Sequence, residues 1–347
     1  MTNFNITILA GDGVGPEVAA SARAVLEVIG QKYGHRFAFD EQLIGGAAID
    51  AKGDPLPEAT LASCRAAHAV FLGAVGGPKW DGGAKRPEQG LLGLRKALQV
   101  FANLRPTFMY PSLIEHSPLR PHYAEGVDFL MFRELTGGSY FGEKKRDGDV
   151  ATDLCIYSAG EVERIARLAF QAARGRRNKV TSVDKANVME TGRLWRETVT
   201  RVHKAEFADV TLEHQLVDSM SMQLIRQPRA YDVVLTENMF GDILSDEASV
   251  IGGSIGLAPS ASLGASGPGL FEPVHGSAPD IAGKDICNPV GAVLSIGLML
   301  NYGLGLKTEA AAIESAVARA LEGGARTTDL GGKLGTQQMT RAIIDAL

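Results

Sequence analysis

Two aspartates four residues apart, Asp242 and Asp246, have types and spacing that suggest chemistry. If their segment is helical, both carboxylates lie on one face with Cβ atoms about 5–6 Å apart. Like charges at this spacing destabilise a helix unless positive charge lies between them, and a divalent cation with oxygen ligands meets that need. Ile243 and Leu244 make the surroundings apolar, and Gly241 indicates a tight entry. A solvated acidic face is the alternative, and it explains most such pairs.

Two other segments carry groups that can exchange a proton. Lys185 follows the strand-like run 179–183, and ligands of open α/β sheets bind beyond the carboxyl ends of strands. A desolvated lysine can act as a general base. Tyr140 lies in the glycine-rich turn 136–142 and could donate a proton if a nearby cation tunes its pKa. An ion-paired surface lysine and a packed tyrosine remain the structural alternatives.

Three arginines suit two-pronged recognition of a carboxylate. They are Arg95, Arg105 and Arg133. Leu91 and Leu92 share a helical face with Arg95, and Glu88 lies about one turn earlier. That face would form a pocket with an apolar wall and a cationic floor, although an ordinary amphipathic helix with a snorkelling arginine has the same pattern.

A nucleotide site is suggested by a run of small residues after the glycine-rich stretch 252–269. The run consists of His275, Gly276, Ser277, Ala278 and Asp280. Small residues let backbone amides approach a phosphate, and Asp280 could bond a ribose while repelling a 2′-phosphate. A plain turn explains the run almost as well. The segment 11–16 begins like G-x-G-x-x-G but ends in Pro16, and no G-x-x-x-x-G-K-[ST] loop exists, so a Rossmann domain is not expected.

Composition excludes several classes of protein. The formal net charge of −5 gives no electrostatic footprint for nucleic acid. The longest apolar stretch, 290–300, is too short to span a bilayer and predicts a buried helix instead. Three separated cysteines without a CxxC pair favour a reducing compartment, and we expect a soluble, cytoplasmic protein.

Strand-like runs alternate with helical patterns along the chain. The runs are 5–10, 69–72, 127–132, 179–183 and 231–236. Pro16 opens a helical pattern through Ile29, and another covers 161–173. This alternation predicts an α/β architecture with substantial parallel pairing. The stretch 252–269 predicts a long loop.

In combination and order, these segments resemble the isocitrate/isopropylmalate dehydrogenase family, metal-dependent enzymes that oxidise and decarboxylate β-hydroxyacids. The resemblance runs end to end. It is carried by Gly11–Glu17, Ala102–Pro106, Arg133–Gly142, Val183–Val188, Val217–Met220, Asn238–Ser249 and His275–Lys284.

The resemblance implies a role for each matching residue. Asp218, Asp242 and Asp246 correspond to ligands of Mg²⁺ or Mn²⁺. Arg95, Arg105 and Arg133 correspond to the carboxylate clamp, Lys185 to the general base, and Tyr140 to the acid that protonates an enol. Leu91 and Leu92 match the wall for an isopropyl group, and Asn187 and Asp218 also match substrate-binding positions. Glu88, His275, Gly276, Ser277, Ala278, Asp280, Asn288 and Asp329 match positions around NAD.

The implied reaction is oxidative decarboxylation of 3-isopropylmalate to 4-methyl-2-oxopentanoate with reduction of NAD, a step of leucine biosynthesis. A D-malate or tartrate dehydrogenase of the same family is the alternative. Isocitrate is disfavoured because Leu91 would strand its extra carboxylate. A metal-stabilised binding protein is a further alternative, but it would be expected to lose Lys185, Tyr140 or an arginine.

The resemblance also implies an architecture. Two lobes would surround a mixed central sheet without a Rossmann domain. Residues 1–100 and 253–347 would form the cofactor-binding lobe, and residues 101–252 the second lobe with a dimer interface. In the homodimer, Lys185, Asn187 and Asp218 would reach the partner subunit's active site. Neither nucleic acid nor membrane is an expected partner.

Overall fold

The computed structural model describes residues 2–347 of the 347-residue chain. Its internal contacts divide the chain into two compact units. Unit 1 comprises Met1–Val100 and Gly253–Leu347, and unit 2 comprises Phe101–Gly252. Each unit combines helices with a mixed sheet of its own strands, which confirms the predicted α/β class with mixed pairing.

The strands of unit 1 lie in the order β2-β1-β3-β12-β11. Their bounds are β1 Thr2–Gly11, β2 His35–Glu41, β3 Ala69–Ala74, β11 Pro259–Leu263 and β12 Gly269–Pro273. The pairs from β2 to β12 are parallel, and β11 runs antiparallel to β12. This order differs from that of a Rossmann domain.

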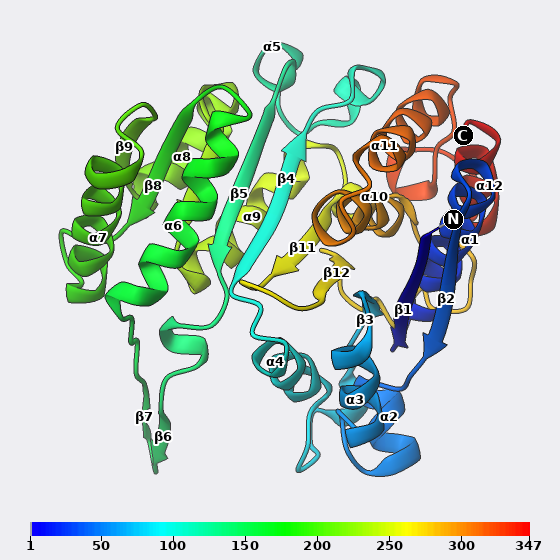
Figure 1. Ribbon diagram of the computed structural model, residues 1–347, viewed down its shortest axis with the longest axis horizontal. Helices are drawn as coiled ribbons and strands as arrows, with labels where there is room; N and C mark the ends of the chain where they lie inside the picture. The colour runs from blue at the N-terminus through cyan, green and yellow to red at the C-terminus, as the bar shows by residue number, and fades with distance from the viewer. Residues whose placement is uncertain (1) are drawn as a thin grey trace. The chain divides into compact units, whose positions relative to one another are not determined.

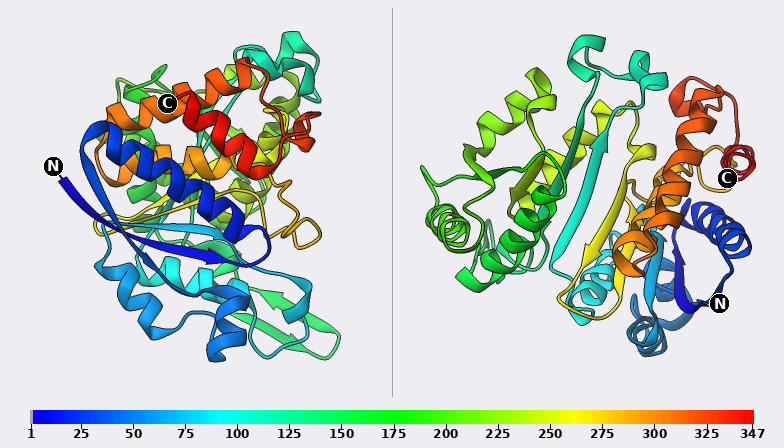
Figure 2. Two further views of the ribbon diagram at one scale, coloured as in Figure 1. Left: turned by 90° about the vertical axis from the view of Figure 1, so that its right-hand side faces the viewer. Right: turned by 45° about the horizontal axis from the view of Figure 1, so that its top comes forward.

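Helix α1 packs on β1, β2 and β3, and α10 packs on β11 and β12. Figure 2 shows α1, α11 and α12 running beside one another on the outside of unit 1. The helices are α1 Gly15–Tyr33, α2 Gly45–Lys52, α3 Glu58–Ala66, α4 Pro87–Ala97, α10 Val290–Leu298, α11 Lys307–Glu322 and α12 Thr336–Asp345. Short turns are η1 Pro78–Trp80, η5 Ile255–Leu257, η6 Met299–Gly303 and η7 Thr328–Leu330.

The strands of unit 2 lie in the order β4-β5-β10-β8-β9. Their bounds are β4 Ala102–Phe108, β5 Asp128–Glu134, β8 Lys179–Asp184, β9 Thr211–Leu216 and β10 Val233–Thr236. Strand β4 is antiparallel to β5, and the remaining pairs are parallel. The carboxyl ends of β5, β8, β9 and β10 therefore meet at one edge, where ligands of open sheets bind.

Helices α6 and α9 cover opposite faces of these strands in Figure 1. The helices of unit 2 are α5 Pro121–Ala124, α6 Ala159–Arg174, α7 Glu190–Glu206, α8 Val217–Arg226 and α9 Asn238–Ile251. Short turns are η2 Pro111–His116, η3 Gly138–Tyr140 and η4 Pro228–Ala230.

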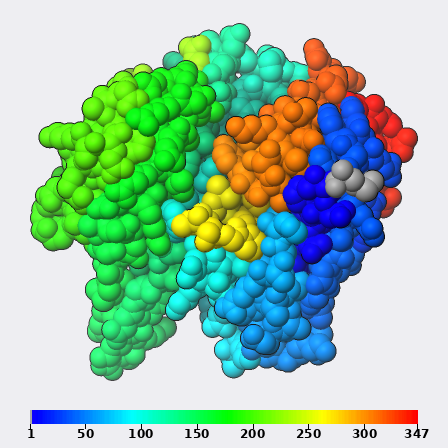
Figure 3. All heavy atoms as spheres, viewed as in Figure 1, coloured from blue at the N-terminus to red at the C-terminus, as the bar shows by residue number. Residues whose placement is uncertain are grey.

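A hairpin of β6 Lys144–Asp147 and β7 Val150–Asp153 extends from unit 2 as a thin arm in Figures 1 and 3. Every residue of its two strands is exposed. Val150 retains 65% of its accessible surface, and Leu154 beyond the arm retains 49%.

The predicted strands all overlap observed ones, and the predicted buried helix is α10. The loop predicted over 252–269 is wrong, because it contains the short turn η5 and strand β11. The run Pro259–Leu263 consists mainly of small residues, but it forms a largely buried strand that pairs with β12. Within residues 2–347, none of the helices combines the length and the apolar character needed to cross a membrane.

Candidate active site

The two aspartates of unit 2 lie on α9, which confirms the helical spacing predicted for them. The Glu237 side chain accepts a hydrogen bond from the Phe240 amide over 2.7 Å and so begins the helix. A Cβ at Gly241 would lie 2.7 Å from Cβ and Cγ of Arg133. The first turn of α9 can therefore approach β5 this closely only with glycine at position 241.

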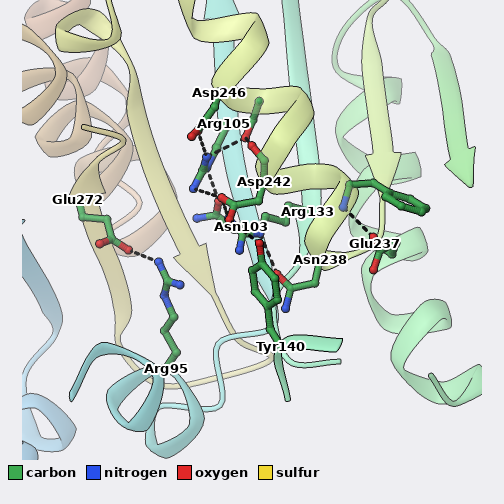
Figure 4. Close-up of polar contacts among 12 residues, drawn as sticks. Arg95, Asn103, Arg105, Arg133, Tyr140, Glu237, Asn238, Asp242, Asp246 and Glu272 are labelled. Atoms are coloured by element: carbon green, nitrogen blue, oxygen red, sulfur yellow. Dashed lines mark hydrogen bonds and ion pairs between the residues drawn. The ribbon is translucent and has the colours of Figure 1, made fainter. Parts of the chain in front are cut away.

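Two arginines from neighbouring strands meet these carboxylates (Figure 4). Arg105 Nη1 donates to Asp246 Oδ1 over 2.9 Å, and its Nη2 lies 3.4 Å from Asp242 Oδ1. Arg133 Nη1 bonds the same Asp242 oxygen, although only 4% of the Arg133 side chain is exposed. Antiparallel pairing of β4 with β5 places both guanidiniums beside α9. The positive charge that the sequence required between the aspartates is thus present as arginine.

Tyr140 approaches the same carboxylate from the turn η3. Its hydroxyl donates to Asp242 Oδ2 over 3.0 Å, and the Arg133 guanidinium lies 5.7 Å from the centre of its ring. Burial and the Asp242 charge raise the pKa of Tyr140. A raised pKa keeps the phenol protonated, which is the state that a proton donor requires.

Asp246 is more open, with 57% of its side chain exposed. Burial of its carboxyl group and the Asp242 charge raise its pKa, and Arg105 opposes that shift. Across residues 2–347, no three acidic, histidine or cysteine side chains gather to hold a metal. Asp242 and Asp246 are thus two neighbouring carboxylates without a third such side chain beside them in the described residues.

Lys185 and Asp218 form a second polar group of unit 2. Lys185 follows β8 and Asp218 lies in the first turn of α8, and Lys185 Nζ is 2.5 Å from Asp218 Oδ1. This hydrogen bond lowers the pKa of Asp218. Asn187 is exposed nearby in the chain. The structure thus pairs the predicted base with the predicted third metal ligand, a contact that sequence reasoning missed.

The predicted substrate pocket of unit 1 lies on α4. Arg95 Nη2 donates to Glu272 Oε1 over 2.8 Å, and the Arg95 Nε atom is buried without a hydrogen-bond partner in the described chain. Leu91 and Leu92 are half-buried on the same helix. Sequence reasoning missed Glu272, which lies in β12, far from Arg95 along the chain.

Loops at the carboxyl ends of β1 and β3 converge on Asp12. Its carboxylate accepts hydrogen bonds from the amides of Gly46, Ala47 and Gly76, at 2.8 to 2.9 Å. Ser277 is brought into the same group, because its carbonyl accepts from the Val14 amide over 2.8 Å. Asp12 was missed because its partners lie 34 to 64 residues away in sequence.

Glu88 lies at this point too. A Cβ at Gly76, where φ is +116°, would lie 2.9 Å from Glu88 Oε1 and 3.9 Å from Ser277 Oγ. Glycine is therefore required for backbone conformation and for space. The structure thus brings Glu88 and Ser277, both predicted cofactor residues, to one place.

Asn288 and Asp329 form the other part of the predicted cofactor site. Asp329 Oδ2 accepts from Asn288 Nδ2 over 3.0 Å and from Ser254 Oγ over 2.5 Å. His275 Nε2 is buried and has no hydrogen-bond partner in the described chain, and burial lowers the pKa of this ring.

The remaining cofactor candidates lie on the adjoining loop. Gly276 and Asp280 are exposed, and Ala278 adopts a φ of +38°. The loop thus presents backbone and one carboxylate outward, beside the histidine whose pKa burial lowers.

Comparison with known proteins identifies the family to which this chain belongs. Residues 5–346 match the family described as isocitrate/isopropylmalate dehydrogenase. A protein named 3-isopropylmalate dehydrogenase from Anaeromyxobacter dehalogenans is 57% identical, with 99% of each chain covered. One of that name from Geobacillus kaustophilus is 55% identical, covering 100% of this chain and 96% of the relative.

Solved structures agree with this assignment. The crystal structure of isocitrate dehydrogenase from Methylococcus capsulatus has a TM-score of 0.88 and 37% identity, with 99% of each chain covered. A β-decarboxylating dehydrogenase from Thermococcus kodakarensis has a TM-score of 0.83 and the same identity, covering 99% of this chain and 96% of that one. The chain therefore belongs to the isocitrate/isopropylmalate dehydrogenase family.

Proposed function

We propose that this protein oxidises and decarboxylates 3-isopropylmalate to 4-methyl-2-oxopentanoate with reduction of NAD, in leucine biosynthesis. The observation that carries the proposal is the convergence of Arg105, Arg133 and Tyr140 on Asp242. Arginines suit the carboxylates of a malate, and a protonated phenol suits the return of a proton after decarboxylation. Relatives that are 55–57% identical bear the name of this activity.

A Mg²⁺ or Mn²⁺ ion fits the donor set of this site. Asp242 and Asp246 offer carboxylate oxygens, which hard divalent cations prefer. Burial and the Asp242 charge raise the pKa of Asp246, and a divalent cation between the two carboxylates would offset their mutual repulsion. When bound, the metal would supply Lewis-acid stabilisation of the charge that develops on the substrate oxygen.

The chain's own residues would perform the remaining steps. Arg95, Arg105 and Arg133 bind the two carboxylates and orient the substrate, and Leu91 and Leu92 contact its isopropyl group. Lys185, which would come from the partner subunit of the proposed dimer, would take the proton of the substrate hydroxyl, and NAD, when bound, would supply the hydride acceptor. After CO₂ leaves, the Tyr140 hydroxyl returns a proton to the enol.

NAD fits the loops of unit 1. Glu88, His275, Gly276, Ser277, Ala278, Asp280, Asn288 and Asp329 would line its site. The buried Nε2 of His275 has no hydrogen-bond partner in the described chain, so it could accept a hydrogen bond from the cofactor or donate one to it. Exposed Asp280 would bond the adenosine ribose and repel a 2′-phosphate, so NAD is preferred to NADP.

The active enzyme is proposed to be a homodimer with shared sites. Lys185, Asn187 and Asp218 would complete the site of the partner subunit. Lys185 and Asp218 lie together, and the chain alone gathers no three metal-binding side chains among residues 2–347. The exposed arm and the exposed Met222, Ile225 and Ile243 of α8 and α9 supply apolar surface for such an interface.

Steady-state kinetics with 3-isopropylmalate, D-malate and isocitrate tests this function, each with NAD and NADP, and with and without EDTA. The highest kcat/KM is expected for 3-isopropylmalate with NAD, and EDTA should abolish it until Mg²⁺ or Mn²⁺ is restored. Faster turnover of isocitrate or D-malate would reject the substrate assignment. Activity that survives EDTA would reject the metal site.

A further inference from the structure

Asn238 joins two parts of the proposed active site, although its type and spacing do not single it out in the sequence. It is the first residue of α9, and 1% of its surface is exposed. Its Oδ1 accepts from Arg133 Nε over 2.9 Å, and its Nδ2 donates to the Gly137 carbonyl over 3.1 Å (Figure 4). One amide therefore contacts both an arginine of the proposed carboxylate clamp and the turn that carries the proposed proton donor.

Hydrogen bonds and ring packing both hold the turn that carries Tyr140, residues 136–140. The Glu134 carboxylate accepts from the amides of Thr136 and Gly137 over 2.9 and 2.7 Å. A Cβ at Gly137 would lie 2.4 Å from the Tyr157 ring, so the turn packs directly on that ring. The backbone that carries Tyr140 thus has little freedom, and the Asn238 amide ties this backbone to Arg133.

Asn238 is not needed to begin the helix. Glu237 already caps α9 by accepting from the Phe240 amide. The Asn238 backbone amide donates to the Tyr157 hydroxyl over 2.9 Å, which leaves its side chain directed at Arg133 and the turn. Capping alone therefore does not explain an asparagine here.

We propose that Asn238 is a positioning residue that holds the Arg133 guanidinium and the turn bearing Tyr140 in one arrangement around the substrate. The asparagine amide offers, on two separate atoms, both the acceptor and the donor that this position uses. A carboxylate would keep the bond to Arg133 but face the Gly137 carbonyl without a proton. An apolar side chain would leave both buried groups without this partner. The proposal rests on the proposed function for its choice of reaction.

Two variants separate the two bonds. Asn238→Asp keeps the acceptor for Arg133 and loses the donor to Gly137, so kcat should fall about tenfold or more while KM for the hydroxyacid stays within about threefold. Asn238→Leu loses both bonds, so kcat should fall and KM for the hydroxyacid should rise about tenfold. KM for NAD should be unchanged in both variants.

Thr236→Val is the matched control. Thr236 is fully buried just before α9, and its hydroxyl donates to the Val183 carbonyl over 3.1 Å. This variant should lower the thermal midpoint while kcat and both KM values remain those of the wild type. If the Asn238 variants likewise lose only thermal stability, the positioning role is wrong.

Asn238→Ser keeps the test decisive if neither of the other Asn238 variants folds. It keeps a small polar side chain, but its shorter hydroxyl cannot reach both the Arg133 guanidinium and the Gly137 carbonyl. A fall in kcat is expected, and unchanged kcat and KM would overturn the proposal. All variants are assayed with whichever hydroxyacid the wild type turns over fastest. Failure of the proposed substrate is thus visible in the wild type, and failure of the positioning role only in the variants.

Discussion

Tyr140 and Asp242 share a hydrogen bond in which the phenol donates to Oδ2 over 3.0 Å. The other oxygen of this carboxylate meets Arg105 and Arg133. One aspartate thus connects the proposed proton donor with two arginines of the carboxylate clamp, and substitutions around it should have separable kinetic effects.

Tyr140→Phe should lower kcat by about 10²-fold or more, because general acid catalysis contributes that much and the ring is kept. KM for 3-isopropylmalate should change little, since Arg105 and Arg133 remain in place. Steady-state kinetics with saturating NAD measures both constants. A variant with normal kcat would show that another group returns the proton.

How much of this site the sequence predicts depends on how far apart along the chain the contacting residues lie. The positions of Asp242 and Asp246 on one helical face follow from spacing, and the need for positive charge between them follows from Coulomb repulsion. That Arg105 and Arg133 supply this charge depends on antiparallel pairing of β4 with β5, to which no local pattern points. The spacing of the two aspartates favours a metal ion between them, whereas the fold also places two arginines beside them.

Other parts of the molecule were hidden from sequence for different reasons. Strand β11 consists mainly of small residues and lies in a glycine- and serine-rich stretch, so its own composition predicts a loop, whereas its pairing with β12 makes it a buried strand. Asp12 and Asn238 act through backbone groups far along the chain, and a side chain's partners at such range cannot be read from residue type. Strong apolar strands such as Ala69–Ala74 were predicted because burial on both faces leaves its mark in composition.

Leu91→Ala should lower kcat/KM for 3-isopropylmalate about tenfold, because it removes three side-chain carbons worth roughly 0.8 kcal/mol each when fully buried, and Leu91 is half-buried. D-malate lacks the isopropyl group, so its kcat/KM should change much less. The two substrates measured on one variant provide the control, since loss of folded protein lowers both equally. Equal losses would place Leu91 outside the substrate pocket.

Glu134→Gln should alter how stability depends on pH. Burial raises the pKa of Glu134, so the folded state holds this proton to higher pH than the unfolded state. The free energy of unfolding of the wild type therefore falls as pH rises from the ordinary glutamate pKa through the folded one. The stability of the variant relative to wild type should increase over that range and then level off.

Glu163→Gln is the matched control for this pH effect. Hydrogen bonding to Arg201 lowers the pKa of Glu163, so the stability it contributes is present above the ordinary glutamate pKa and is lost as pH falls. Its variant should lose stability relative to wild type as pH rises from the lowered folded pKa to the ordinary one. Urea unfolding from about pH 3 to about pH 8 covers both ranges, and slopes of the same sign would contradict the environment assigned to Glu134.

Mixed dimers test whether Lys185 serves the partner subunit's site. Asp242→Asn and Lys185→Met should each be inactive alone. If sites are shared, a dimer with one chain of each kind contains one site with both residues intact. Random pairing then makes about half of the dimers mixed, each with one of two sites working, so activity should recover to about one quarter of wild type.

The matched control pairs Asp242→Asn with Asp246→Asn, which lie on the same helix and would damage both sites of a mixed dimer. Co-expressing the chains with two different tags and purifying through both isolates the mixed dimers, for which about half of wild-type activity is expected from the first pair and none from the second. Recovery by neither pair would place Lys185 and Asp242 in one subunit's site. The Lys185–Asp218 ion pair would then have to open for Lys185 to reach the substrate, because its Nζ is held 2.5 Å from that carboxylate.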